Sequence, residues 1–225
     1  MQHLKDIELP WLAEIGATAM VNVSGHSFDE YVQVIEALED APVDAYEVNI
    51  SCPNVDAGGM TIGTHVESVE KVVGMCREAT ARPLIVKLTP NVTDIAEIAR
   101  AAESAGADAI SLINTLMGMA IDADRRCTLT SRPFAGFSGP AIKPVALRCV
   151  WQVCNAVKIP VIGIGGITCA QDVLEFILVG AHAVEIGTMN FVRPDAAFRI
   201  AEELPHLCQQ LGIKNLAEFR GTLQL

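Results

Sequence analysis

One cysteine stands in a position where a thiol could act as a base or a nucleophile. Cys52 follows the β-rich run DAYEVNIS (44–51) and begins the loop CPNVDAGG, whose turns are forced by Pro53 and Gly58–Gly59. Asn49 would point to the same side of the sheet as a pocket there if Ile50 points away from it. A buried thiol without a chemical role is the alternative, and the residue types alone leave both open.

Lys87 interrupts an otherwise apolar run, LIVKL. An ammonium in a buried strand is unfavourable unless it meets an anion. The negative edge of a cofactor or an internal carboxylate such as Glu47 could supply that anion. Asn114 and Thr115, which end a later run, could hydrogen-bond a polar heterocycle or could form a simple turn.

Glycines end the last two β-rich runs. Gly165–Gly166 closes PVIGIGG and Gly187–Thr188 closes HAVEIGT. Glycine lets the backbone approach a phosphate, which amides and a helix N-terminus can bind without cationic side chains. Ser138–Gly139, just before an expected helix, could add a third contact. These turns predict a phosphate-bearing ligand.

These residues depend on elements that alternate between short strands and helices. Thr168 and Gln171 are spaced as a capping box for the helix after the fifth run. The segment from the fourth run to Gly139 has little periodicity, which is typical of a binding loop or lid. The six expected strands are residues 17–25, 44–51, 83–89, 108–115, 160–166 and 182–188.

Six consecutive βα units predict an α/β fold with a parallel sheet, either doubly wound or a barrel. Candidate functional residues at nearly every strand end, and glycines on the last two strands, favour a (β/α)8 TIM-type barrel. A closed barrel of this type needs eight units, so we expect an incomplete one that lacks its first two. We therefore expect residues 1–225 to form a single, N-terminally incomplete barrel domain.

The composition excludes several classes of protein. A formal net charge of −11 argues against a nucleic-acid or anionic-membrane partner. No apolar run is long enough to span a membrane, and the N-terminus does not resemble a signal peptide, so a cytoplasmic location is expected. Seven cysteines without a C-x-x-C pair, and scattered histidines, predict neither a disulfide framework nor a metal site.

Taken together and in order, six motifs resemble the catalytic subunit of the NAD-linked (class 1B) dihydroorotate dehydrogenases, from about residue 10 to the end. The flavin barrel of dihydropyrimidine dehydrogenase is the runner-up, and a non-redox phosphate-sugar barrel is the alternative from another class. The motifs are NISCPNV, IVKLTPNVTDI, LINTLMGMAID, FSGPAIKPVALR, IPVIGIGGI and VEIGTMNF.

The resemblance implies an FMN-binding barrel that oxidises dihydroorotate to orotate in pyrimidine (UMP) biosynthesis. Cys52 matches the base that removes the proton from ring carbon 5, while hydride leaves carbon 6 for the flavin. Lys87 matches the lysine at the flavin's pyrimidine edge, where negative charge develops on reduction. Asn49, Asn114 and Thr115 match substrate contacts. The matches to cofactor contacts are Asn22, Asn49, Lys87, Ile113, Gly139, Gly165, Gly166, Gly187 and Thr188.

The resemblance also implies partners. A separate electron-transfer subunit would carry FAD and a [2Fe-2S] cluster and pass electrons to NAD, around a homodimer of the catalytic subunit in a heterotetramer. The family's first two strands have no counterpart here, and they would carry further flavin and substrate contacts. We therefore expect the full-length parent to be active and this chain alone to be impaired.

Overall fold

The computed structural model describes residues 1–51 and 62–224. Six strands are hydrogen-bonded in the order β1-β2-β3-β4-β9-β10, and the registers of β1 with β2, β2 with β3 and β9 with β10 are parallel. Each lies inside one of the six runs expected from the sequence, so the prediction of an α/β fold with a parallel sheet is confirmed. The incomplete eight-unit barrel and the single domain stay predictions.

The chain forms two compact units. Unit 1 comprises residues 1–88, 94–111 and 155–160, and unit 2 comprises residues 89–93, 112–154 and 161–225. The described elements of unit 1 are η1 (Leu4–Glu8), α1 (Leu9–Glu14), β1 (Met20–Val23), α2 (Phe28–Leu38), β2 (Ala45–Asn49), η2 (Ile62–Thr64), α3 (Val66–Ala79), β3 (Leu84–Leu88), α4 (Ile95–Ser104) and β4 (Ala109–Leu112), whose last residue belongs to unit 2.

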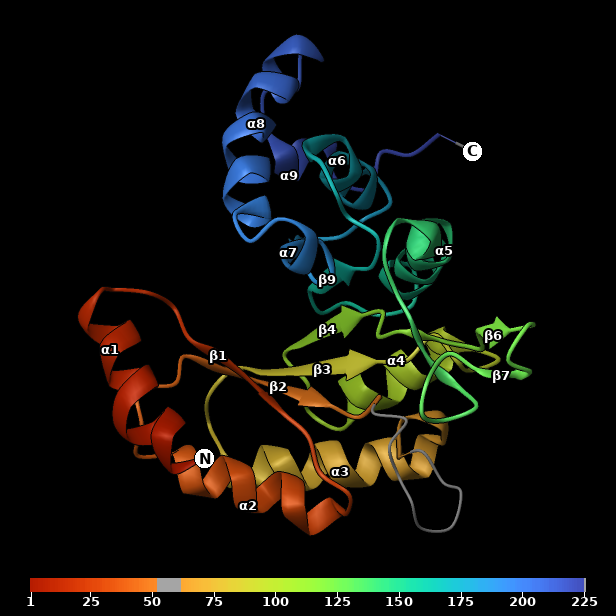
Figure 1. Cartoon of the computed structure of the whole chain (residues 1–225). Helices are drawn as coiled ribbons and strands as arrows, with labels where there is room; N and C mark the ends of the chain where they lie inside the picture. The colour runs from red at the N-terminus through yellow and green to blue at the C-terminus, as the bar shows by residue number, and fades with distance from the viewer. Residues whose placement is uncertain (52–61, 225) are drawn as a thin grey trace. The chain divides into compact units, whose positions relative to one another are not determined.

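In unit 1, helices cover one face of the strands, and the alternation of side chains decides which residues face them (Figure 1). Tyr46 and Val48 are fully buried, and the Tyr46 hydroxyl donates to the carbonyl of Ile35 in α2. Glu47 and Asn49 alternate with them and therefore lie on the other face of β2. The helices thus leave one face of this sheet to polar side chains.

Helix starts in unit 1 follow the expected capping chemistry. Ser27 accepts a hydrogen bond from the Glu30 amide at the start of α2, and the Asp94 carboxylate accepts from the amides of Ala96 and Glu97 at the start of α4. Gly106, with φ of +104°, follows the end of α4 in the left-handed conformation that glycine favours.

Unit 2 contains the remaining elements. They are β5 (Leu116–Gly118), β6 (Ile121–Asp122), β7 (Cys127–Thr128), β8 (Ala135–Phe137), η3 (Pro140–Ile142), α5 (Lys143–Cys154), β9 (Val161–Ile164), α6 (Ala170–Leu178), β10 (Ala183–Glu185), α7 (Met189–Val192), α8 (Ala196–Gln210) and α9 (Leu216–Phe219).

The aperiodic segment before Gly139 is not a plain loop. It forms two antiparallel ribbons, β5 with β8 and β6 with β7. Strands of two or three residues are too short to show an alternating pattern, which is why the sequence did not predict them.

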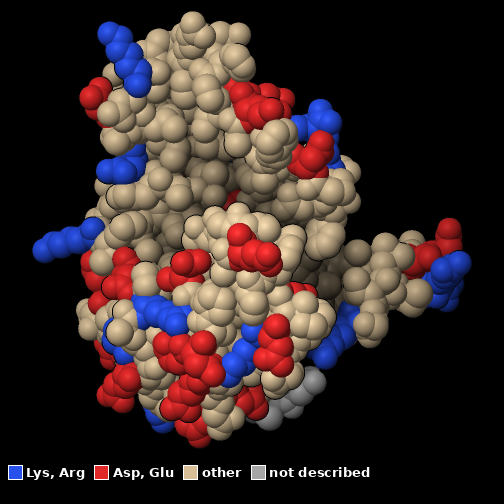
Figure 2. Space-filling model, turned by 90° about the vertical axis from the view of Figure 1, so that its left-hand side faces the viewer, with Lys and Arg blue, Asp and Glu red and all other residues tan. Residues whose placement is uncertain are grey.

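None of the helices in the described part of the chain combines the length and apolar character that crossing a bilayer requires. On the face drawn in Figure 2, acidic side chains gather with basic ones among them, and the basic side chains of the described residues form no continuous stripe there.

Candidate active site

Three polar side chains of unit 1 surround one buried carboxylate. Glu47 in β2 is 3% exposed, and it accepts hydrogen bonds from residues on three other strands of the sheet. Asn22 of β1 donates through Nδ2, Ser111 of β4 donates through Oγ at 2.6 Å, and Lys87 of β3 places Nζ 3.1 and 3.3 Å from the two carboxylate oxygens. We call these four residues the Glu47 network.

Asn49 extends the Glu47 network along β2. Its Nδ2 donates to the Asn22 side chain at 3.4 Å, and its Oδ1 accepts from the Ser51 hydroxyl at 2.5 Å. The Tyr31 hydroxyl of α2 fixes the Asn49 carbonyl at 3.0 Å. The structure therefore brings together three residues predicted from the sequence, Asn22, Asn49 and Lys87.

Of the two anions considered for Lys87, the structure contains the internal carboxylate, Glu47. The ion pair does not exclude a further role of the ammonium, because a lysine has three donors. Cys52, the predicted base, lies outside the described residues.

Three glycine-containing turns of unit 2 converge. Gly139, Gly165 and Gly166 have φ values of +94°, +130° and +77°. A Cβ atom on Gly166 would lie 2.8 Å from the backbone nitrogen of Lys143 and 3.0 Å from the carbonyl oxygen of Gly139, so the turns after β8 and β9 are in close contact. The Thr188 hydroxyl, after β10, donates to Ser138 Oγ at 2.8 Å.

We call these segments, Ser138–Gly139, Gly165–Gly166 and Gly187–Thr188, the glycine turns. Ile113 lies beside them, because a Cβ on Gly165 would lie 3.2 Å from Ile113 Cγ1, and its amide donates to the Ile164 carbonyl. The predicted role of these glycines and of Thr188 in binding a phosphate stays a prediction. Amides and hydroxyls of this kind suit an anion.

A capping box does begin α6, but it lies one residue later than the predicted pair Thr168 and Gln171, and its partners are Cys169 and Asp172. The Asp172 carboxylate accepts from the Thr168 amide and hydroxyl at 2.7 and 2.8 Å and from the Cys169 amide at 3.2 Å. Asp172 also receives Lys143 Nζ at 2.6 Å. The three-residue spacing is kept, and the box is displaced because the N-cap of α6 is Cys169 instead of Thr168.

This carboxylate has a lowered pKa. Burial would raise the pKa of Asp172, but the Lys143 ammonium and the hydrogen bonds from Thr168 together hold it below its ordinary value. Lys143 donates hydrogen bonds to Asp172 and Glu175, and these bonds raise its own pKa in turn. The amides at 168 and 169 are engaged by this carboxylate, so the amides of the glycine turns are the candidates for binding an anion.

An asparagine that the sequence analysis did not single out organises the loop after β4. Asn91 Nδ2 donates to the Thr115 carbonyl at 3.0 Å, and Asn91 Oδ1 accepts from the Met117 amide at 3.0 Å. The Thr89 hydroxyl accepts from Asn91 at 3.0 Å and holds it in place. Asn91 follows a proline after the end of β3, and asparagine is a common turn residue at such places. That position was the sequence signal that could have identified Asn91.

Asn114 and Thr115 follow β4 as predicted. Asn114 Oδ1 accepts from the Thr115 amide at 2.8 Å, which is a local bond of the kind that turns contain. This bond fits the turn alternative for Asn114, and its role as a substrate contact stays a prediction.

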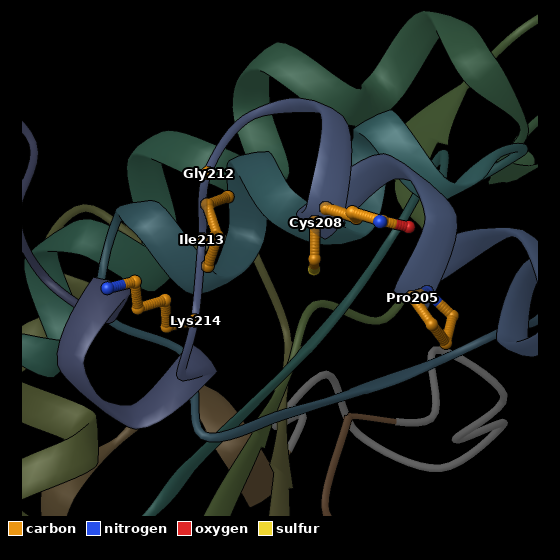
Figure 3. Close-up of a pocket in the computed structure, with 6 residues that line it drawn as sticks. Pro205, Cys208, Gly212, Ile213 and Lys214 are labelled. Carbon is orange, nitrogen blue, oxygen red and sulfur yellow. The ribbon is translucent and has the colours of Figure 1, made fainter.

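An open groove of about 510 Å³ lies at the end of α8, away from these residues in the sequence. Pro205, Cys208, Gln209, Gly212, Ile213 and Lys214 line it, with Pro205 on one side and Ile213 and Lys214 on the other (Figure 3). None of them was predicted to contact a ligand. Within residues 1–51 and 62–224, no group of three or more His, Cys, Asp and Glu side chains is placed to hold a metal ion.

Comparisons with known proteins agree with the resemblance found in the sequence. The family model described as dihydroorotate dehydrogenase matches residues 4–208. Three relatives are named dihydroorotate dehydrogenase B (NAD(+)), catalytic subunit. They come from Alkaliphilus metalliredigens (50% identical over 216 residues), Trichlorobacter lovleyi (53% over 218) and Solidesulfovibrio magneticus (54% over 218).

Each alignment covers 96% of this chain, and it covers 72%, 72% and 71% of the respective relative. Identity at this level over nearly the whole chain, together with the family match, shows that the chain belongs to the dihydroorotate dehydrogenase family of oxidoreductases.

Proposed function

We propose that this protein is the catalytic subunit of an NAD-linked dihydroorotate dehydrogenase, which works in the cytoplasm and oxidises dihydroorotate to orotate for pyrimidine biosynthesis. The observation that carries the proposal is the identity of 50–54% to relatives named as that subunit.

The donor groups of each unit, taken by itself, suit one part of FMN. In unit 2, the glycine turns present amides and the Thr188 hydroxyl to a phosphate, with Ile113 beside them. In unit 1, Lys87 offers an ammonium, and Asn22 and Asn49 offer amides, to the polar edge of a flavin. When bound, FMN would supply the acceptor for the hydride.

The protein's own residues would orient the substrate and move the proton. Asn49, Asn114 and Thr115 would hydrogen-bond the polar ring of dihydroorotate. Cys52 would take the proton from ring carbon 5, for which a thiol is far better suited near neutral pH than a hydroxyl, because it ionises much more readily. Each of these roles follows from the residue-by-residue match to the family.

The partner would be an electron-transfer subunit that carries FAD and a [2Fe-2S] cluster, and the catalytic subunit would form the homodimer at the centre of a heterotetramer. The words "catalytic subunit" and "NAD(+)" in the names of the relatives support a partner that completes the reaction.

One experiment separates the alternatives. Purified protein is loaded with FMN and mixed anaerobically with dihydroorotate or, in parallel, with 5,6-dihydrouracil. Loss of flavin absorbance with dihydroorotate alone supports the proposal, and loss with dihydrouracil alone favours the dihydropyrimidine dehydrogenase-like alternative. Bound FMN without reduction by either indicates an impaired chain, and failure to bind FMN points to a non-redox barrel.

A further inference from the structure

The Glu47 network contains a charge whose role the proposed function does not yet explain. Glu47 is 3% exposed in the centre of β2, and the side chain of Lys87 is 13% exposed beside it. Removing a carboxylate and an ammonium from water costs several kcal/mol per ion. The ion pair is therefore weak evidence for stability, since an apolar pair of similar volume would serve the fold equally well.

The geometry shows what Glu47 does to its neighbours. In the strand registers, Asn22 lies opposite Glu47, and Asn49 lies opposite Lys87. Glu47 takes a hydrogen bond from Asn22 and two contacts from the Lys87 ammonium, and Ser111 fixes the carboxylate itself. One buried anion thus sets the position of two residues that the family match assigns to the cofactor.

The Glu47 carboxylate also offsets part of the positive charge of the Lys87 ammonium. Reduction of a flavin places negative charge on its pyrimidine edge, which a nearby ammonium stabilises. A carboxylate about 3 Å from that ammonium offsets part of this stabilisation, because the interior screens charges weakly.

We propose that Glu47 is a positioning residue that holds the Lys87 ammonium and the Asn22 amide for the flavin and lowers the flavin's reduction potential by offsetting the charge of Lys87. The inference rests on the proposed function, since it requires FMN beside Lys87. It concerns a residue that does not itself need to touch the cofactor.

The test is a redox titration of the FMN-loaded protein and of Glu47→Gln. Glutamine keeps the shape and one acceptor oxygen but removes the charge, so the potential should rise. We expect the ratio of reduced to oxidised flavin at a fixed potential to increase roughly tenfold, or ~30 mV for a two-electron couple. FMN should also dissociate faster, because Lys87 and Asn22 are less firmly held.

Glu39→Gln is the matched control. Glu39 also belongs to unit 1 and forms a partly buried ion pair, with Arg82 at 3.3 Å. It is not part of the Glu47 network, and its substitution should leave the potential unchanged. An unchanged potential in Glu47→Gln, or an equal rise in both variants, would overturn the inference.

A second variant covers the case in which Glu47→Gln does not fold. Glu47→Gln/Lys87→Met removes both charges together, which leaves no unpaired ion in the interior. Its potential should lie above that of Lys87→Met, which keeps the Glu47 carboxylate. Equal potentials in these two variants would contradict the inference, whereas wild-type protein that binds no FMN would instead contradict the proposed function.

Discussion

The two units prepare their ligand-binding residues by different physical means. In unit 1, side chains form the candidate site: within the Glu47 network, charge and hydrogen bonding hold the Lys87 ammonium and the Asn22 side-chain amide on a regular parallel sheet. In unit 2, the backbone itself forms the candidate site: Gly139, Gly165 and Gly166 hold positive φ angles, and a Cβ atom on Gly166 would collide with the backbone of the turn after β8.

Because one site is formed by side chains and the other by backbone turns, the two units should tolerate different substitutions. A network of charges fails when one partner is removed and the other is left buried. A backbone turn fails when an atom is added, whatever its charge. The free energy of unfolding of the FMN-free protein measures this contrast.

The largest effect should follow the loss of the buried cation. Lys87→Met leaves Glu47 buried with its ammonium partner removed, and we expect the free energy of unfolding to fall by about 3–5 kcal/mol in urea titration. Arg125→Met is the control, since Arg125 is 82% exposed and 3.7 Å from Asp122. Its loss should cost about 0–1 kcal/mol. Equal losses would mean that burial does not distinguish the pairs.

An added methyl group should break the backbone-built region. Gly166→Ala puts a Cβ into the Lys143 backbone at a φ of +77° and should cost about 2–3 kcal/mol. Gly212→Ala has a similar φ of +70° but nothing within 4 Å, so it should cost only about 1 kcal/mol. Thermal or urea unfolding measures both, and similar losses would show that packing contributes nothing at Gly166.

In unit 2, Asp172, Lys143 and Glu175 form a charged cluster, so the stability that this cluster contributes should depend on pH. The folded state lowers the pKa of Asp172 below its ordinary 3.8, so its contribution is present above that value and is lost as the pH falls through the folded pKa. Asp172→Asn should therefore cost about 2 kcal/mol at pH 7 and progressively less below about pH 4. Asp195→Asn, at an exposed pair with Arg199, should change unfolding far less.

A pH-independent difference between wild type and Asp172→Asn would show that the carboxylate charge is not what caps α6.

The smallest effect should come from an exposed side chain that holds a loop. Asn91→Ala removes the bonds to Thr115 and Met117 and should cost about 1 kcal/mol. Hydrogen exchange at the Met117 amide should accelerate, because its acceptor is lost. Asn215→Ala, which uncaps α9 elsewhere in unit 2, should leave that amide unchanged. Exchange that is equally fast in both variants would contradict a specific role for Asn91.

Much of this arrangement was predictable because local patterns carry it. β-rich runs bounded by glycine or polar residues located all six strands of the sheet, and the glycines at 165, 166 and 187 fell at strand ends as expected. Lys87 stood out because a charge in an apolar run needs a partner, and Glu47 was among the partners considered.

What was missed depends on contacts between distant residues. Ser111 is an unremarkable residue in an apolar strand, and only the pairing of β4 in the sheet brings it to Glu47, 64 residues away. Asn91 has a role only because it reaches Thr115, and the cap of α6 depended on whether the helix began after Thr168 or after Cys169. Sequence spacing cannot rank such alternatives when several residues fit.

We propose that this protein oxidises dihydroorotate with Cys52 as the base. The most direct test is the single-turnover rate of flavin reduction by dihydroorotate in FMN-loaded wild type and Cys52→Ser, measured at neutral pH with bound FMN quantified in both. We expect Cys52→Ser to keep its bound FMN, and we expect dihydroorotate to reduce that FMN roughly 10²- to 10⁴-fold more slowly than in the wild type. Equal rates in the two proteins would contradict it.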